Sequence, residues 1–342
     1  MILPQTHFAA LIVMILSLLC VGLWVNTYKL AGKLRFEVYY IDFAIGLGIA
    51  AVVFAFTLGN LGFDGFSLMD DLMQVHKRQW VEAFGAGVVF NLANMFLMAA
   101  ISVSSLAVSF PVAFGFTLVL GLLLGQIGLR SSNPLYLAIG CVVVVAAIVA
   151  DVLAHRGLFA VRKAATSQEG KVVRTPRATK GLVLALVSGL LMAGIHPLVE
   201  LARTGDSPLG PYSLMFLFGL GAFISTIIFS LFFMNLPVQG QPLEIMDFVK
   251  IRAKRHMYGV AGGMVFFAGA LAVNVAGATA PEAQLGRATT FALSNAGTPI
   301  AALCGLLVWK EFQEAGGRPK TLAFLALILF AIGLGWFSMV LG

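Results

Sequence analysis

Charged residues are scarce in this chain of 342 residues. Asp, Glu, Lys and Arg together make up only 11% of it, whereas soluble domains carry about 25%. Hydrophobic residues make up 60%, and the mean hydropathy is +0.96. A chain with so little charge cannot use water as its main solvent, so its composition excludes a soluble domain and predicts a membrane protein.

Cysteines and catalytic signatures are also scarce. The three cysteines, Cys20, Cys141 and Cys304, lie in apolar stretches, where an isolated thiol behaves as a small hydrophobic group. No disulfide or metal framework is visible. The sequence also lacks H-E-x-x-H, G-x-S-x-G and G-x-x-x-x-G-K-[ST] motifs. We therefore expect no catalytic residues, no metal and no cofactor, which argues against an enzyme.

Ten apolar stretches of about twenty residues fill most of the chain, and a helix needs about 20 residues to cross a bilayer core. The stretches are continuously apolar rather than alternating, which favours helices over a barrel. The predicted spans are residues 8–25, 40–58, 81–101, 106–124, 135–153, 182–201, 212–233, 257–275, 288–308 and 322–341. The sequence thus predicts an all-α, polytopic protein of the inner or plasma membrane.

The basic residues lie in the loops between these spans. With ten spans, all but five of the 22 Lys and Arg residues fall on one side; the exceptions are Lys77, Arg78, Arg130, Arg203 and Arg287. The positive-inside rule places the basic side in the cytoplasm and both termini outside it. The formal charge of +7 is thereby explained by membrane orientation, and no nucleic-acid partner is expected.

A polar segment over residues 156–180 divides the chain into residues 1–155 and 181–342, each with five predicted spans. Because five is odd, the second part enters the membrane in the opposite sense, as in the inverted repeats of many secondary transporters. Short internal matches keep the same order in both parts; for example, Gly22-Leu23-Trp24-Val25 matches Gly194-Ile195-His196-Pro197. We therefore predict two five-helix repeats joined by a cytoplasmic linker.

The polar side chains inside the spans are mostly amides and hydroxyls. Such groups suit a neutral solute with several hydrogen-bonding positions rather than an ion. The predicted solute-binding residues are Trp24, Asn91, Asn94, Ser109, Asn274, Ser294, Asn295 and Thr298. For Asn91 and Asn94, an interhelical hydrogen bond is an equal alternative. For Trp24, the alternative is a place in an interfacial aromatic belt.

His196 and Glu200 are four residues apart and share a helical face. A carboxyl group in or at the edge of a bilayer is a candidate proton carrier, so this pair is the predicted proton-coupling site. The alternative is a surface pair between Glu200 and Arg203. Asp42 is a minor candidate, because Asp42 and Asp151 are expected at the cytoplasmic ends of their helices as interfacial anchors.

Three motifs resemble those of a known transporter family. Phe291-Ala292-Leu293-Ser294-Asn295, followed by Gly305-Leu306-Leu307-Val308-Trp309-Lys310-Glu311, is similar to the ninth helix of bacterial glucose uptake proteins. Tyr40-Ile41-Asp42-Phe43 and Gly22-Leu23-Trp24 look like segments of ureide permeases. The chain thus resembles the drug/metabolite transporter superfamily, in its branch of glucose/ribose porters, rhamnose/proton symporters and ureide permeases.

The resemblance implies ten helices, outward-facing termini and solute/proton symport. Two departures bear on the solute: Asn295 replaces the Gln of the glucose proteins, and the central linker is shorter than that of plant ureide permeases. We expect a secondary transporter that moves a small neutral polar solute by alternating access, a monosaccharide first and a ureide or nucleobase second. An intramembrane enzyme or a non-transporting sensor is the alternative from another class, and the sequence indicates no oligomeric state.

Overall fold

A computed structural model describes residues 1–32, 34–62, 66–123, 134–168, 178–204 and 207–341. Within these ranges every regular element is helical and no strand occurs. Nine helical segments of the described chain are long and apolar enough to cross a membrane, and His7–Leu23 is a shorter apolar helix. The prediction of an all-helical polytopic protein is therefore confirmed. Arg130 and residues 169–177 of the predicted linker lie outside the described residues.

The chain forms two compact units. Unit 1 comprises residues 1–92, 194–237 and 241–297. Unit 2 comprises residues 93–193, 238–240 and 298–342. Each unit takes segments from both sides of the predicted linker, so the units do not coincide with the predicted repeats.

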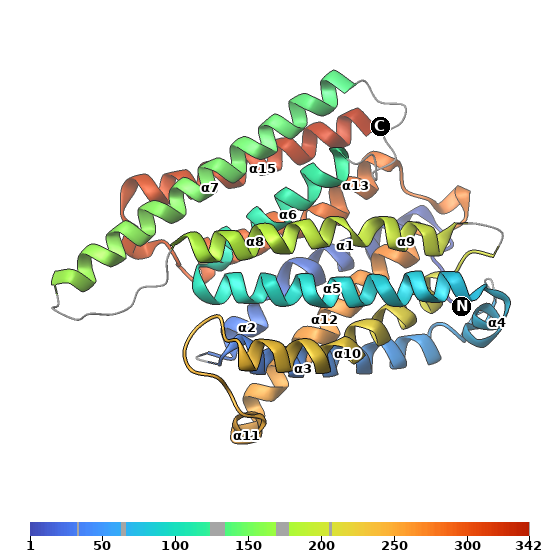
Figure 1. Cartoon of the computed structure of the whole chain (residues 1–342). Coiled ribbons are helices and arrows are strands. Elements are labelled where there is room, and N and C mark those ends of the chain that lie inside the picture. The colour runs from blue at the N-terminus through green and yellow to red at the C-terminus, as the bar shows by residue number, and fades with distance from the viewer. Residues whose placement is uncertain (33, 63–65, 124–133, 169–177, 205–206, 342) are drawn as a thin grey trace. The chain divides into compact units, whose positions relative to one another are not determined.

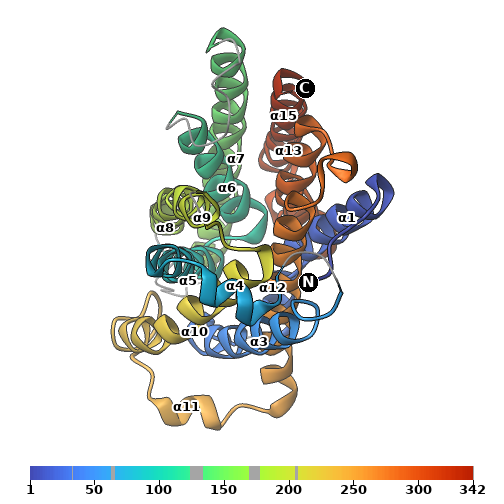
Figure 2. The same cartoon turned by 90° about the vertical axis from the view of Figure 1, so that its right-hand side faces the viewer.

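Unit 1 is built around α3 (Phe36–Phe56), which packs against α10 (Pro211–Asn235) and α12 (Ala253–Gly277), while α1 (His7–Leu23) packs against α12 (Figure 2). Its other elements are α2 (Asn26–Leu30), α4 (Leu68–Gln74), most of α5 (Lys77–Val103), α9 (Ile195–Arg203), α11 (Ile245–Val249), η1 (Pro281–Ala283) and α13 (Arg287–Asn295).

Glycine allows the closest helix contact in unit 1. A Cβ atom at Gly263 of α12 would overlap the backbone carbonyl of Phe43 in α3. Inside a bilayer no hydrophobic force draws helices together, so close van der Waals packing through small residues contributes much of the association. Gly263 therefore fixes the distance between α3 and α12.

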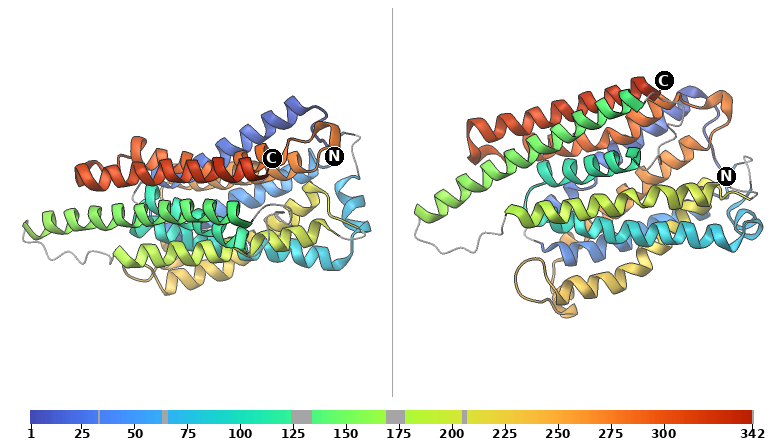
Figure 3. Two further views of the ribbon diagram at one scale, coloured as in Figure 1. Left: turned by 90° about the horizontal axis from the view of Figure 1, so that it is seen from above. Right: turned by 45° about the horizontal axis from the view of Figure 1, so that its top comes forward.

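Unit 2 contains two long neighbouring helices, α7 (Pro134–Gln168) and α15 (Gly317–Leu341), which lie side by side in Figures 1 and 3. α6 (Leu106–Leu123) packs against α8 (Ala178–Ala193) and α7. The remaining elements are the end of α5, most of α14 (Gly297–Leu303), the π-helical turn η2 (Cys304–Val308) and η3 (Gln313–Ala315). α7 carries helical structure to Gln168, into the segment that the sequence assigns to a linker.

Candidate functional site

Two of the predicted spans are interrupted close to a proline. α8 ends at Ala193 and α9 begins at Ile195, and α13 ends at Asn295 and α14 begins at Gly297. Proline has no backbone N–H, so a proline leaves the carbonyl four residues before it without its helical donor. Those carbonyls belong to Ala193 for Pro197 and to Asn295 for Pro299, which are the last residues of α8 and α13. Transporters often place such interruptions beside their substrates.

A third interruption separates α1 from α2 at Trp24 and Val25. The Thr27 hydroxyl donates a hydrogen bond of 2.7 Å to the Trp24 carbonyl oxygen. The Thr27 backbone N–H donates to the same carbonyl at 3.1 Å, so the chain turns there without leaving this acceptor unpaired.

Trp24 lies inside an aromatic cluster of unit 1. Its side chain is 1% exposed, and its ring centroid is 5.0 Å from that of Phe43 and 5.5 Å from that of Phe266. Phe266 in turn stacks on Phe90 at 4.7 Å. In this conformation the indole face is covered by protein, so stacking of Trp24 on a solute requires a rearrangement of the cluster.

Asn91 is bonded within unit 1. Its Nδ2 donates to the Ser225 hydroxyl at 2.7 Å, and its Oδ1 accepts from the Thr226 hydroxyl at 3.1 Å. The Tyr40 hydroxyl donates to the Asn91 backbone carbonyl at 3.2 Å. Asn91 is 1% exposed, and its amide joins α5 to α10, which matches the interhelical alternative.

Three predicted solute-binding residues lie in unit 2, and all three are buried: Asn94, Ser109 and Thr298. The hydroxyl of Ser109 is hydrogen-bonded to that of Ser104. Thr298 lines a small cavity together with Pro111, Pro299 and Asp151. The structure therefore gathers Thr298 and two of the helix prolines around one space.

Ser294 and Asn295 are half-buried at the end of α13 in unit 1. Both side chains bond to their own helix: the Ser294 hydroxyl donates to the Thr290 carbonyl at 2.7 Å, and Asn295 Nδ2 donates to the Phe291 carbonyl at 2.9 Å. Side chains that bond back to the carbonyl four residues earlier compete with the helical hydrogen bonds and often bend a helix, which agrees with the interruption of α13 at this point.

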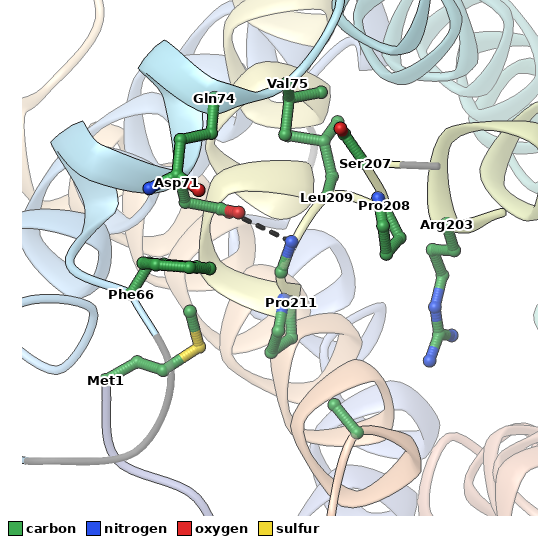
Figure 4. A pocket seen from close by; sticks show the side chains of 12 residues that line it. Met1, Phe66, Asp71, Gln74, Val75, Arg203, Ser207, Pro208, Leu209 and Pro211 are labelled. Atoms are coloured by element: carbon green, nitrogen blue, oxygen red, sulfur yellow. Dashed lines mark hydrogen bonds between the residues drawn. The ribbon is translucent and has the colours of Figure 1, made fainter. Parts of the chain in front are cut away.

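A pocket of about 430 Å³ lies at one end of unit 1. Asp71 of α4 and Arg203 at the end of α9 line opposite sides of it (Figure 4). The buried Asp71 carboxylate accepts the Gly210 N–H at 2.9 Å. Arg203 Nη1 donates to Asn274 Oδ1 at 3.5 Å, so the predicted site residue Asn274 positions the guanidinium. Arg203 forms no ion pair with any carboxylate of the described residues.

This pocket brings a cationic donor and an anionic acceptor to one space. The Arg203 guanidinium can donate to a carbonyl oxygen, and the Asp71 carboxylate can accept from an N–H group. The pocket can therefore bind a small polar solute that carries both kinds of group. Asn274 was predicted from the sequence as a site residue, whereas Asp71 and Arg203 were not. The pocket is lined by segments that lie far apart in the sequence, so no local spacing indicated it.

His196 and Glu200, the predicted proton-coupling pair, both lie on α9 and are exposed. No hydrogen bond joins their side chains, and Glu200 forms no ion pair with Arg203, among the residues that the structure describes. The pair shares a helix, as predicted, without forming a bonded unit.

Asp42 has a partner that the sequence did not reveal. The carboxylate is 2% exposed, and its two oxygens lie 2.8 and 2.9 Å from Nδ1 of His256, in the first turn of α12. The ring of Phe248 packs edge-on against His256 at 4.6 Å. A buried carboxylate in contact with an imidazole forms an acid–base pair between which a proton can be held. His256 follows Lys254 and Arg255 in the sequence, and nothing in the spacing of these residues indicated its contact with Asp42.

Comparisons with known proteins support a transport role. No family model matches the chain. The chain is 23% identical to ureide permease 4 of Arabidopsis thaliana over 93% of both chains. It is also 23% identical to ureide permease 5 of the same plant, over 97% of this chain and 94% of that protein, and 22% identical to ureide permease 1 over 96% of both.

A protein of known crystal structure shares the fold, with a TM-score of 0.53 and 14% sequence identity over 98% of both chains. Together with the apolar helices, these similarities establish a multi-pass membrane protein. They support the ureide permease part of the predicted resemblance, whereas the glucose/ribose porter part stays a prediction. In sequence, the chain is thus similar from end to end to membrane permeases.

Proposed function

We propose that this chain is a membrane transporter for a small polar solute of the ureide class. The observation that carries the proposal is the similarity to three ureide permeases over 93% to 97% of the chain. The apolar helices and the absence of catalytic motifs agree with transport rather than with an enzyme. The monosaccharide expected from the sequence becomes the second choice, because none of these relatives is named for sugars.

The pocket of unit 1 suits this solute class. A ureide contains urea-type groups, in which a carbonyl oxygen is flanked by N–H donors. The Arg203 guanidinium would donate to the carbonyl oxygen, and the Asp71 carboxylate would accept from an N–H. A charged donor and a charged acceptor give hydrogen bonds that are shorter and stronger than neutral ones, so the pocket favours this pattern over an apolar ligand.

Alternating access through an inverted repeat is the mechanism that we propose. The interruption between α1 and α2 lies within Gly22-Leu23-Trp24-Val25, and the interruption between α8 and α9 lies within Gly194-Ile195-His196-Pro197. These are the two segments that the internal sequence match pairs, which supports the 5+5 repeat with both termini outside the cytoplasm. Interrupted helices at corresponding positions of two repeats are typical of transporter binding sites.

For proton coupling, the geometry favours Asp42 with His256 over His196 with Glu200. Asp42 is buried and bonded to a titratable partner, whereas His196 and Glu200 are exposed. A buried charge resists a conformational change that a neutral group permits. Proton transfer to this pair would therefore change the free energy of rocking between the two access states.

A binding assay on purified protein tests the solute class. We expect allantoin, a cyclic ureide, to raise the apparent unfolding temperature, since a ligand that binds the native state stabilises it. Glucose should raise it less. Arg203→Gln should remove most of the allantoin shift, whereas the control Arg78→Gln, which loses only an exposed pair with Glu82, should retain it. Stabilisation by glucose and not by allantoin would overturn the ureide assignment.

A further inference from the structure

Unit 2 contains a carboxylic acid that the transport proposal does not use. Asp151 lies near the middle of α7 and is 2% exposed. Its Oδ2 atom has no hydrogen-bond partner among the described residues, and Asp151 forms no ion pair with any of them. The sequence predicted that Asp151 lies at the cytoplasmic end of its helix, whereas α7 continues to Gln168 and the Asp151 side chain is enclosed by protein.

A small cavity adjoins Asp151. Its volume is about 10 Å³, which is about the space that one water molecule needs. Apolar and proline side chains from α6, α14 and α15 form most of its wall, among them Pro111, Pro299 and Phe330. Thr298 contributes a hydroxyl. The cavity is therefore large enough for one water molecule beside the acid and too small for an organic solute.

A second carboxyl group acts on Asp151 from nearby. The carboxylate of Glu311 accepts the backbone N–H groups of Leu106 at 3.0 Å and Ala107 at 2.8 Å, at the start of α6. Backbone N–H donors at a helix N-terminus stabilise a negative charge. Glu311 lies within electrostatic reach of Asp151, and two neighbouring carboxylates away from water do not both ionise readily. Of the two carboxyl groups, Asp151 is the one whose Oδ2 has no such donor among the described residues.

Among the residues that the structure describes, no cationic side chain forms an ion pair with Asp151. His155, one turn further along α7, is buried and its ring packs against Phe159. Arg156, Glu314, Arg318 and Lys320 on α7, η3 and α15 are exposed. The described residues of α6 and α14 carry no titratable side chain.

We propose that Asp151 is a proton-binding site of unit 2. Without water in the adjoining cavity the carboxyl group holds a proton, and it releases that proton to water only when water reaches the cavity. The O–H bond of the acid breaks, the proton passes to the water molecule, and the carboxylate remains. The inference is independent of the solute and therefore goes beyond the proposed function. In a transporter, such a site would couple proton release to the opening of unit 2.

Infrared difference spectroscopy during a pH titration of the purified protein tests the proposal without any solute. The wild type should show the C=O stretch of a protonated carboxyl group, and that band should disappear as the pH rises. Asp151→Asn should lack this component of the band. The control Glu314→Gln, which removes an exposed carboxyl group of the same unit, should keep it. A band that is missing from the wild type, or unchanged in Asp151→Asn, would overturn the proposal.

Glu311→Gln provides a second, independent readout. Removal of the neighbouring negative charge favours ionisation of Asp151, so the band should disappear at lower pH than in the wild type. This variant keeps Asp151 and therefore tests the site even if Asp151→Asn does not fold. A midpoint that does not move would contradict the role assigned to Glu311. Failure of ureide binding would leave both infrared results unaffected, so the two proposals are tested separately.

Discussion

Replacement of Asn91 by alanine decides between the two roles that the sequence allowed for this residue. The substitution removes both side-chain hydrogen bonds between α5 and α10, to Ser225 and Thr226. The Ser225 hydroxyl, which accepts from Asn91, donates to the Ala222 carbonyl at 3.2 Å. The same carbonyl lies 2.8 Å from the Thr226 hydroxyl and is an alternative acceptor for its proton when Asn91 is absent. Neither partner is therefore left without a hydrogen bond, and the cost is limited to the lost contacts and a small cavity.

The expected loss of stability is modest. An interhelical hydrogen bond in a membrane protein contributes about 0.6 kcal/mol on average, with an upper value of about 1.7 kcal/mol. Two such bonds and the lost packing together predict that Asn91→Ala lowers the free energy of unfolding by about 1 to 2 kcal/mol. Solute affinity should remain at the wild-type value, because the amide is occupied within the protein.

Unfolding in mixed micelles measures the free energy of unfolding, and a solute-binding assay measures the affinity. Asn235→Ala is the matched control, because Asn235 is an exposed amide at the end of α10 whose side chain bonds, among the described residues, only to the Leu231 carbonyl. Its loss should leave stability nearly unchanged. If Asn91→Ala instead abolished solute binding at unaltered stability, the residue would contact solute, and the packing interpretation would be wrong.

Two further predictions use pairs of variants. Gly263→Val should lower the free energy of unfolding by about 1 to 3 kcal/mol, because the new side chain would overlap the Phe43 carbonyl. The control Gly85→Ala, where a Cβ meets no neighbouring atom, should be neutral or stabilising by up to about 1 kcal/mol. An equal loss of stability in both variants would contradict the close contact at Gly263. Asp42→Asn should abolish solute uptake driven by a pH gradient and spare solute counterflow, because an amide cannot carry the proton. Glu200→Gln should affect neither uptake nor counterflow. The opposite pattern would assign proton coupling to Glu200.

The spans were predictable because a bilayer imposes length and composition on each helix. Residues 106–124 and 212–233 correspond closely to α6 and α10. Pro197 and Pro299 lie just after the two interrupted helix ends, since loss of a backbone donor is a local effect. Proline alone does not predict an interruption, because Pro111 lies inside the continuous helix α6. The short helices α2, α4 and α11 were not predicted, because segments of five to seven residues are too short to show a helical periodicity.

The partners of buried polar residues were not predictable. Asn91 and Asn94 lie three residues apart, yet they belong to different units, and the bonding of Asn91 depends on α10, more than a hundred residues away. Likewise, Asp42 pairs with His256 across 214 positions. Asp151 seemed to end a helix because the polar residues after it resemble a linker. Spacing identifies residues on one helix face, but only the packing shows what that face meets.

Solute counterflow in proteoliposomes measures whether the protein carries a ureide across a membrane. Liposomes that contain the purified protein and an internal excess of unlabelled allantoin should transiently accumulate labelled allantoin from outside, without any ion gradient. Labelled glucose should not accumulate under the same conditions with an internal excess of glucose. Allantoin accumulation no greater than in protein-free liposomes would contradict the account of this chain as a ureide-class transporter.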